Sequence, residues 1–236
     1  QPLFKRVFNS FTKDKSDFSE EVLESFNQCL ACKACTSQCP IKVDVPTFRA
    51  RFLSVYYKKF LRPMKDYLVA GVESLTPMLA KAPRIANVAI SNPLSSYFIR
   101  SIIGYVDTPK LSHLNLLKWC KANDFTSFDL DKLKTLSANE RKKHVLIVQD
   151  PFTSFYEAQL VADFMTVLAR LGYSPVLLPF KPNGKPQHVK GFLDTFAKTA
   201  KTTSSFLAEV AKLKIPMIGV DPSLTLCYRD EYKTIL

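Results

Sequence analysis

The cysteine spacing near the N-terminus constrains this chain more than any other feature. Four of its six cysteines lie within residues 29–39, in the segment CLACKACTSQCP. In this C-x₂-C-x₂-C-x₃-C-P spacing, three thiolates on one tight turn can bind three irons of a cubane while backbone N–H groups point at its sulfides. We therefore predict a 4Fe-4S site whose ligands are Cys29, Cys32, Cys35 and Cys39. Cys39 completes this cubane only if it bends back, because in proteins with two such runs the fourth cysteine ligates the other cluster.

Zinc and disulfides are the competing uses of these cysteines. Structural zinc sites usually pair two C-x₂-C knuckles that are separated by a longer loop, whereas this run has no such loop between its cysteines. A length of 236 residues allows a core without disulfide staples, so a reducing, cytoplasmic location fits better than a secreted disulfide framework. Cys120 and Cys227 have no neighbouring cysteine, and we expect both to be core residues rather than ligands.

Helices are expected on both sides of the cysteine motif. Ser19, followed by two glutamates, is typical of a helix start and predicts a helix to about residue 28. Asp44 and Pro46 predict an N-cap and first turn of a longer helix that ends near residues 62–63. Prolines then divide residues 63–110 into short helices.

The last part of the chain has a different pattern, in which apolar runs alternate with helical stripes. After a polar stretch at 123–143, expected as a linker, this pattern predicts an α/β region with a parallel sheet and right-handed crossovers. The predicted order is a strand at 144–148, a helix at 156–171 closed by Gly172, a strand at 175–178, helices at 188–200 and 203–213, and a strand at 215–220.

Charge and hydropathy exclude several partner classes. The net charge of +12 is spread along the chain without a nucleic-acid-binding signature, which predicts a solvated basic surface and no nucleic-acid partner. No apolar stretch approaches the roughly 18 residues of a spanning helix. Peripheral membrane contact stays open through an aromatic stripe beside Lys58 and Lys59, although such a stripe more often faces a core; it consists of Phe52, Tyr56 and Phe60.

No catalytic residue is predicted. A Ser, His and Asp constellation is not visible, and the histidines at 113, 144 and 188 are scattered, with surface or strand-edge settings expected for each.

Residues 29–53, CLACKACTSQCPIKVDVPTFRARFL, resemble the C-terminal electron-transfer region of FAD-linked oxidases of the D-2-hydroxyglutarate and D-lactate dehydrogenase type. The rest more weakly resembles a Rossmann-like domain of the cysteine-rich CCG type, also seen in heterodisulfide reductase and glycerol-3-phosphate dehydrogenase subunits. The resemblance implies an electron relay. A flavin domain of the same polypeptide would oxidise a D-2-hydroxy acid, and electrons would pass from FAD through the 4Fe-4S cluster to an unidentified acceptor.

Together, pattern and resemblance predict an α+β to α/β fold with three parts. Residues 1–62 form an all-helical, ferredoxin-like cluster segment, 63–142 a helical connector and linker, and 143–236 a truncated CCG-like α/β domain with a parallel sheet.

The chain departs from the CCG pattern at two places. Residues 182–186 read PNGKP where the family has adjacent cysteines, and Cys227 is displaced by three residues from the family position. A lone cysteine cannot hold a cubane, so we expect no metal in this half, a plain turn at 182–186 and a core role for Cys227.

The resembled proteins also carry a further cysteine motif before this one and a second CCG repeat after it. We therefore expect a piece of a longer protein that holds its cluster weakly and binds neither FAD nor substrate itself. The alternative is a noncatalytic interaction module with a structural metal, whose basic surface docks an acidic protein.

Overall fold

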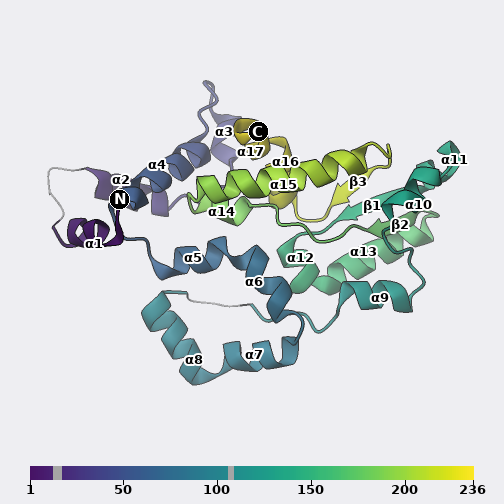
Figure 1. Ribbon diagram of the computed structural model, residues 1–236, viewed down its shortest axis with the longest axis horizontal. Helices are drawn as coiled ribbons and strands as arrows, with labels where there is room; N and C mark the ends of the chain where they lie inside the picture. Colours follow the sequence, from purple (N-terminus) through teal and green to yellow (C-terminus); the bar gives the residue numbers. More distant parts are fainter. Residues whose placement is uncertain (13–17, 106–108) are drawn as a thin grey trace. The chain divides into compact units, whose positions relative to one another are not determined.

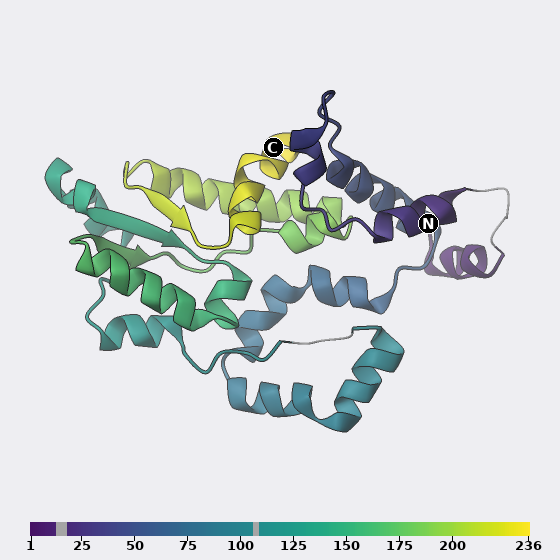
Figure 2. The same cartoon turned by 180° about the vertical axis from the view of Figure 1, so that it is seen from behind.

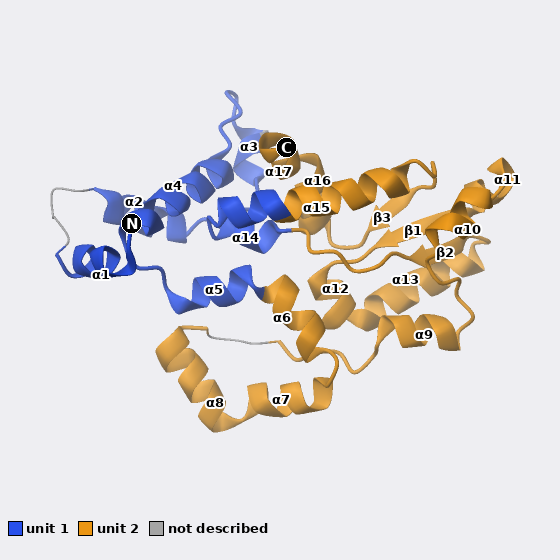
Figure 3. Ribbon diagram, in the orientation of Figure 1, with its two compact units in different colours: residues 1–71, 184–198 blue, residues 72–183, 199–236 orange. Residues whose placement is uncertain are grey.

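The computed structural model describes residues 1–12, 18–105 and 109–236 (Figure 1). The chain forms two compact units (Figure 3). Unit 1 holds residues 1–71 and 184–198, and unit 2 holds residues 72–183 and 199–236. These units are discontinuous in sequence, and the functional division at 62 and 142 stays a prediction.

Unit 1 is helical. The helix predicted to start at Ser19 is confirmed, and so is the cap of the longer helix, since the Asp44 carboxylate accepts the Thr47 N–H at 3.1 Å. Because the aromatic side chains of that longer helix turn inward, they form the core of unit 1. The helices are α1 (Leu3–Phe11), α2 (Ser19–Asn27), α3 (Ala34–Gln38), α4 (Val45–Lys59), α5 (Met64–Ala70), α14 (Lys185–Val189) and the first turns of α15 (Leu193–Ala211).

The aromatic stripe of α4 is a core face. Tyr56 and Phe60 are buried together with Leu53 and Tyr57, and Phe52 packs against this cluster. The rings of Tyr56 and Phe60 are in contact, with centroids 4.6 Å apart and an interplanar angle of 37°. This confirms the core interpretation of the stripe.

Unit 2 contains a parallel sheet, as the sequence predicts. Its strands are β1 (His144–Val148), β2 (Ser174–Leu177) and β3 (Met217–Gly219), in the order β2-β1-β3. β1 runs parallel to both neighbours, with His144 opposite Ser174 and Leu146 opposite Met217. The central strand has a buried β-branched and leucine run, as expected where both sheet faces are covered.

Helices cover both faces of this sheet (Figures 1 and 2). On one face, Ile147 packs against Met165 of α13 (Ala158–Arg170), and Gly172 follows that helix at φ +85°. On the other face, Leu146 packs against Val210 from the end of α15. The fold is therefore α+β, with many helices and a small parallel sheet, while the ferredoxin-like and Rossmann-like assignments remain predictions.

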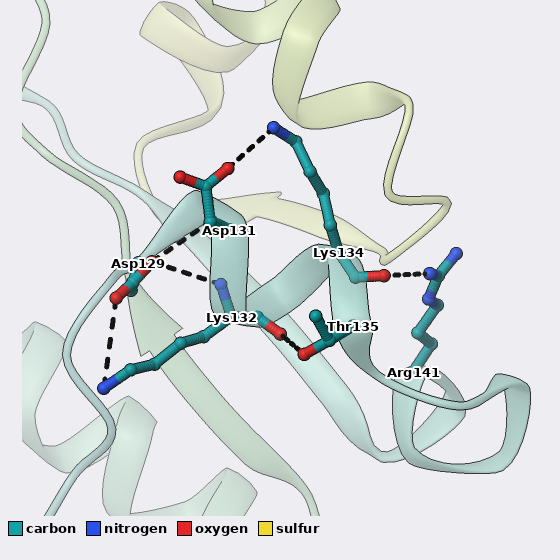
Figure 4. Close-up of polar contacts among 6 residues, drawn as sticks. All are labelled: Asp129, Asp131, Lys132, Lys134, Thr135 and Arg141. Carbon is teal, nitrogen blue, oxygen red and sulfur yellow. Dashed lines mark hydrogen bonds and ion pairs between the residues drawn. The ribbon is translucent and has the colours of Figure 1, made fainter.

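Two predictions about individual elements are wrong. The expected linker holds α10 (Leu130–Thr135) and α11 (Ala138–Lys143), and the two helices expected at 188–200 and 203–213 form the single helix α15 from Leu193 onward. Both short helices have clear starts, because Asp129 caps α10 and Ser137 forms a capping box with Glu140. Figure 4 shows Arg141 bonded to the Lys134 carbonyl at 2.8 Å, which joins the two helices.

The remaining helices of unit 2 are short, and those within residues 63–110 agree with the prediction of short helices there. However, Pro83 and Pro93 begin helices instead of ending them, and Pro77 lies inside one. Within the described ranges, no helix combines the length and apolar character needed to cross a bilayer. The bounds are α6 (Val72–Leu79), α7 (Pro83–Ser91), α8 (Pro93–Phe98), a π-helix (Ile99–Ile103), α9 (Leu116–Ala122), α12 (Pro151–Phe155), α16 (Pro222–Arg229) and α17 (Glu231–Ile235).

Candidate functional site

The four cysteines of the motif lie in one loop between α2 and α4, with α3 in its middle. Two residues between them, Ala31 and Lys33, have φ angles of 56° and 61°. Left-handed conformations are uncommon for residues other than glycine and cost of order 1–3 kcal/mol each. These two residues change the direction of the backbone on both sides of Cys32, directly before α3 begins.

Backbone N–H groups approach two of the sulfurs. The Ala31 N–H donates to Cys29 Sγ at 3.4 Å. Backbone N–H groups of Val43 and Ile41 hold the pKa of the Cys39 thiol below its ordinary value. Donors of this kind stabilise sulfur that carries negative charge, as a metal-bound thiolate does.

The loop is a surface feature. Cys32 and Cys35 are exposed and Cys29 and Cys39 are half-buried, all as free thiols. Within the described ranges, which include all four, no group of three His, Cys, Asp or Glu side chains is close enough to hold a metal ion. The donor set and the N–H groups suit an iron–sulfur cluster, and the structure brings the thiols into one loop without converging them on one point.

Within unit 1, the cysteine loop contacts the start of α4. Lys33 Nζ lies 3.3 Å from Asp44 Oδ2, so the loop contacts the residue that caps α4. Arg49 of α4 is 5% exposed, and it donates from Nε to the Phe26 carbonyl at 2.8 Å and from Nη1 to the Val189 carbonyl at 2.5 Å. A buried guanidinium therefore ties α2, which enters the loop, to α4, which leaves it.

A second arginine holds the 184–198 segment against α4 and α5. The Arg62 guanidinium lies 4.3 Å from the ring centroid of Tyr57 and 3.9 Å from that of Phe192. Beside it, Lys190 Nζ pairs with the buried Asp66 carboxylate at 2.8 Å. These contacts pair the buried charges and hold the 184–198 segment at the C-terminal end of α4.

The two other cysteines are core residues, as predicted. Cys227 is fully buried and Cys120 is 5% exposed, with its Sγ 4.0 Å from Met165 Sδ. Burial raises the pKa of the Cys120 thiol, which disfavours the thiolate that a metal would need.

The interpretation of residues 182–186 as a plain turn is wrong at Asn183, which is 1% exposed and is hydrogen-bonded to other residues of unit 2. Its N–H donates to Glu73 Oε1 at 2.6 Å and its Nδ2 to the Leu224 carbonyl at 3.0 Å, and its carbonyl accepts the Tyr232 hydroxyl at 2.8 Å. An Asn-Gly pair is typical of exposed turns, and nothing local indicates partners so distant in sequence.

The histidines have three different environments. His113 is exposed and His144 is half-buried at the start of β1, as predicted. The prediction is wrong for His188, which is 4% exposed with its ring centroid 5.0 Å from that of Phe196.

Two carboxylates at the carboxyl edge of the sheet escaped the sequence analysis. Asp150 follows β1 and accepts the Phe152 and Thr153 N–H groups at 2.8 Å, and Asp221 follows β3 and accepts the Leu224 N–H at 2.8 Å. Burial raises the pKa of Asp150, and the charge of Asp221 raises it further. Both carboxylates cap helices, so the structure gives them a structural role.

Comparison with curated proteins finds clear relatives. The chain is 52% identical to proteins named D-2-hydroxyglutarate dehydrogenase from Pantoea ananatis and Escherichia coli, over 99% of this chain and 23% of each relative. A protein of the same name from Pseudomonas putida is 39% identical over 94% of this chain and 22% of the relative. The predicted resemblance is thus confirmed, and the chain spans less than a quarter of the relatives it matches. No family model and no solved structure matches it.

Proposed function

We propose that this chain is the electron-relay part of an FAD-dependent dehydrogenase that oxidises D-2-hydroxyglutarate. The observation that carries the proposal is the 52% identity to D-2-hydroxyglutarate dehydrogenases along 99% of the chain. Since the chain spans 23% of those relatives, the flavin and the hydroxy-acid site are proposed to lie in the rest of a longer polypeptide.

In this proposal Cys29, Cys32, Cys35 and Cys39 hold a 4Fe-4S cluster. A bound cluster of this type supplies one-electron transfer, which suits the relay of two electrons from a reduced flavin in single steps. The chain's own contribution is to present four thiols in one loop and to offset their negative charge. The N–H group of Ala31 does this at Cys29, and the N–H groups of residues 41–43 do it at Cys39.

The acceptor that receives the electrons is not identified by the residues of the loop. Exposure of Cys32 and Cys35 places part of the loop at the protein surface, where a partner protein or the flavin domain can approach closely. Outer-sphere electron transfer needs such a close approach. The transfer requires no catalytic acid or base from this chain.

The test uses the longer polypeptide, purified anaerobically with its flavin. D-2-hydroxyglutarate should reduce the flavin, and electrons should then pass to an artificial one-electron acceptor. A Cys32→Ala, Cys35→Ala double variant should keep flavin reduction and lose the transfer, whereas Cys120→Ala, which alters only a buried core thiol, should keep both. Equal transfer by the double variant, or a flavin that D-2-hydroxyglutarate leaves oxidised, contradicts the proposal.

A noncatalytic module with a structural metal is the second candidate. It is favoured by the surface position of the loop and by the net charge of +12, which suits an acidic protein partner. Metal analysis separates the two candidates, because a zinc protein is colourless and contains no labile sulfide, whereas a cluster protein is brown.

A further inference from the structure

Unit 2 contains a cavity of about 600 Å³ at the carboxyl ends of β1 and β2. Gln149 follows β1, and Pro179 and Phe180 follow β2. The other walls come from α9, α12, residues 80–81 after α6, the first residue of α7 and residues 112–115. Open α/β sheets bind ligands outside the carboxyl ends of their strands. The volume also falls within the range of about 300–1,000 Å³ that small-molecule sites have.

One residue that lines this cavity, Ser154, has a buried hydroxyl without a hydrogen-bond partner among the residues that the structure describes. Ser154 of α12 is 4% exposed, and its Oγ makes no hydrogen bond within the described part of the chain. Buried polar groups are nearly always hydrogen-bonded, because leaving one unsatisfied costs about 1–3 kcal/mol. Its neighbour Thr153 is fully used in the Asp150 cap, so the cap explains Thr153 and leaves Ser154 without a role.

Trp119, Phe155 and Phe180 also line the cavity, and contacts between rings hold them in place. Trp119 stacks on Phe125 with ring centroids 5.0 Å apart and an interplanar angle of 25°. Phe155 and Phe180 meet edge to face, also at 5.0 Å. Rings fixed by such pairs offer a flat apolar ligand a surface that needs little reorganisation.

The ionisable side chains at the cavity are all basic. Lys81, Lys118 and His113 line it, and no aspartate or glutamate does. Both lysines are exposed, and neither has a carboxylate partner among the described residues. Cations without partners beside an apolar pocket favour a ligand with a negative charge.

We propose that this cavity binds a small aromatic carboxylate. Its ring lies against Trp119 and Phe155, and Lys81 and Lys118 balance its charge. The Ser154 side chain turns toward the ligand, so that its Oγ donates a hydrogen bond to the carboxylate. The site lies within unit 2 and does not involve the cysteine loop, so the inference goes beyond the proposed electron relay and stands without it.

The chain contains one tryptophan, and it lies in the cavity wall, so tryptophan fluorescence reports occupancy directly. The probes are 1-naphthoate and its neutral analogue 1-naphthamide, titrated into the 236-residue chain with calorimetry as a second readout. We expect saturable quenching of Trp119 by one naphthoate per chain and weaker binding of the amide. Absence of saturable binding, or equal affinity for the two probes, overturns the proposal.

Variants test the individual contacts. Ser154→Ala should weaken naphthoate binding about 3- to 10-fold. The fold should be unharmed, because this change removes a hydroxyl that has no partner. Lys118→Gln should weaken binding by up to about 5-fold. The matched control Lys121→Gln, on the same helix but outside the cavity wall, should bind as the wild type does. If Ser154→Ala and Lys118→Gln also bind like wild type, the probe lies elsewhere and the assignment is wrong.

Discussion

Replacing Gly191 by alanine tests how the 184–198 segment packs against α4. Gly191 has φ +70°, and a Cβ built there would lie 2.7 Å from Leu53 Cβ and 2.9 Å from the Ala50 carbonyl oxygen and the Ser54 nitrogen. Two of these three atoms belong to the backbone of α4, so no side-chain rotation relieves the clash. The 184–198 segment must move away from the helix that leaves the cysteine loop.

The cost is the sum of two effects. A left-handed conformation costs a residue with a Cβ about 1–2 kcal/mol. Overpacking a filled site typically costs about 1–3 kcal/mol more. We therefore expect Gly191→Ala to destabilise unit 1 by about 2–5 kcal/mol. Gly172→Ala is the matched control, because φ there is +85° and nothing lies within 4 Å of the added Cβ, so only the first effect applies.

Urea unfolding followed by far-ultraviolet circular dichroism gives the loss of unfolding free energy for each variant. Hydrogen exchange of α4 peptides shows whether the loss caused by Gly191→Ala arises at α4. Gly191→Ala should lower the free energy of unfolding by about 1–3 kcal/mol more than Gly172→Ala does. It should also speed hydrogen exchange of the α4 amides. Equal costs for the two variants, or unchanged exchange in α4, would refute the close approach of these segments.

Other changes give distinct outcomes. Arg49→Met should lower the free energy of unfolding by about 3 kcal/mol or more, because two backbone carbonyls lose a charged donor. Arg49→Lys should lower it by an intermediate amount. An Arg49→Met variant as stable in urea as the wild type would contradict this prediction. Burial raises the folded-state pKa of Asp150, so the stability it contributes is complete below its ordinary pKa of 3.8 and is lost as the pH rises through the folded value. Asp150→Asn keeps a capping side chain that cannot ionise. As the pH rises from 3.8 toward neutrality, the free energy of unfolding of the wild type should therefore fall relative to that of this variant. Parallel curves of unfolding free energy against pH for the two proteins would contradict the prediction. Iron that the 236-residue chain takes up anaerobically should be substoichiometric and lost on desalting, as the resemblance implies; about four irons per chain, stable to desalting, would contradict that.

The parts of the fold that could be predicted are those written in local sequence. Asp44 and Pro46 mark the start of α4 through capping chemistry alone, and the apolar run at 144–148 indicates a buried strand. By contrast, α10 and α11 lack a periodic apolar stripe, so their polar sequence indicated a linker although caps define both helices.

What could not be predicted depends on contacts between distant segments. Asn183 is buried because Glu73 receives its N–H, and these residues are 110 positions apart. The wall of the cavity in unit 2 likewise comes from segments far apart in sequence. The cysteine spacing predicts the ligand set, but the left-handed Ala31 and Lys33 that shape the loop carry no sequence signal, because neither is glycine.

The central claim is that the loop at residues 29–39 binds an iron–sulfur cluster, and electron paramagnetic resonance tests it most directly. The chain is reconstituted anaerobically with iron and sulfide, reduced, and measured without desalting. We predict the signal of a reduced, spin-one-half cluster in the wild type and in Cys120→Ala, and none when Cys29, Cys32, Cys35 and Cys39 are all alanine. The same signal without these four cysteines, or a colourless chain that binds one zinc in place of iron, would contradict the claim.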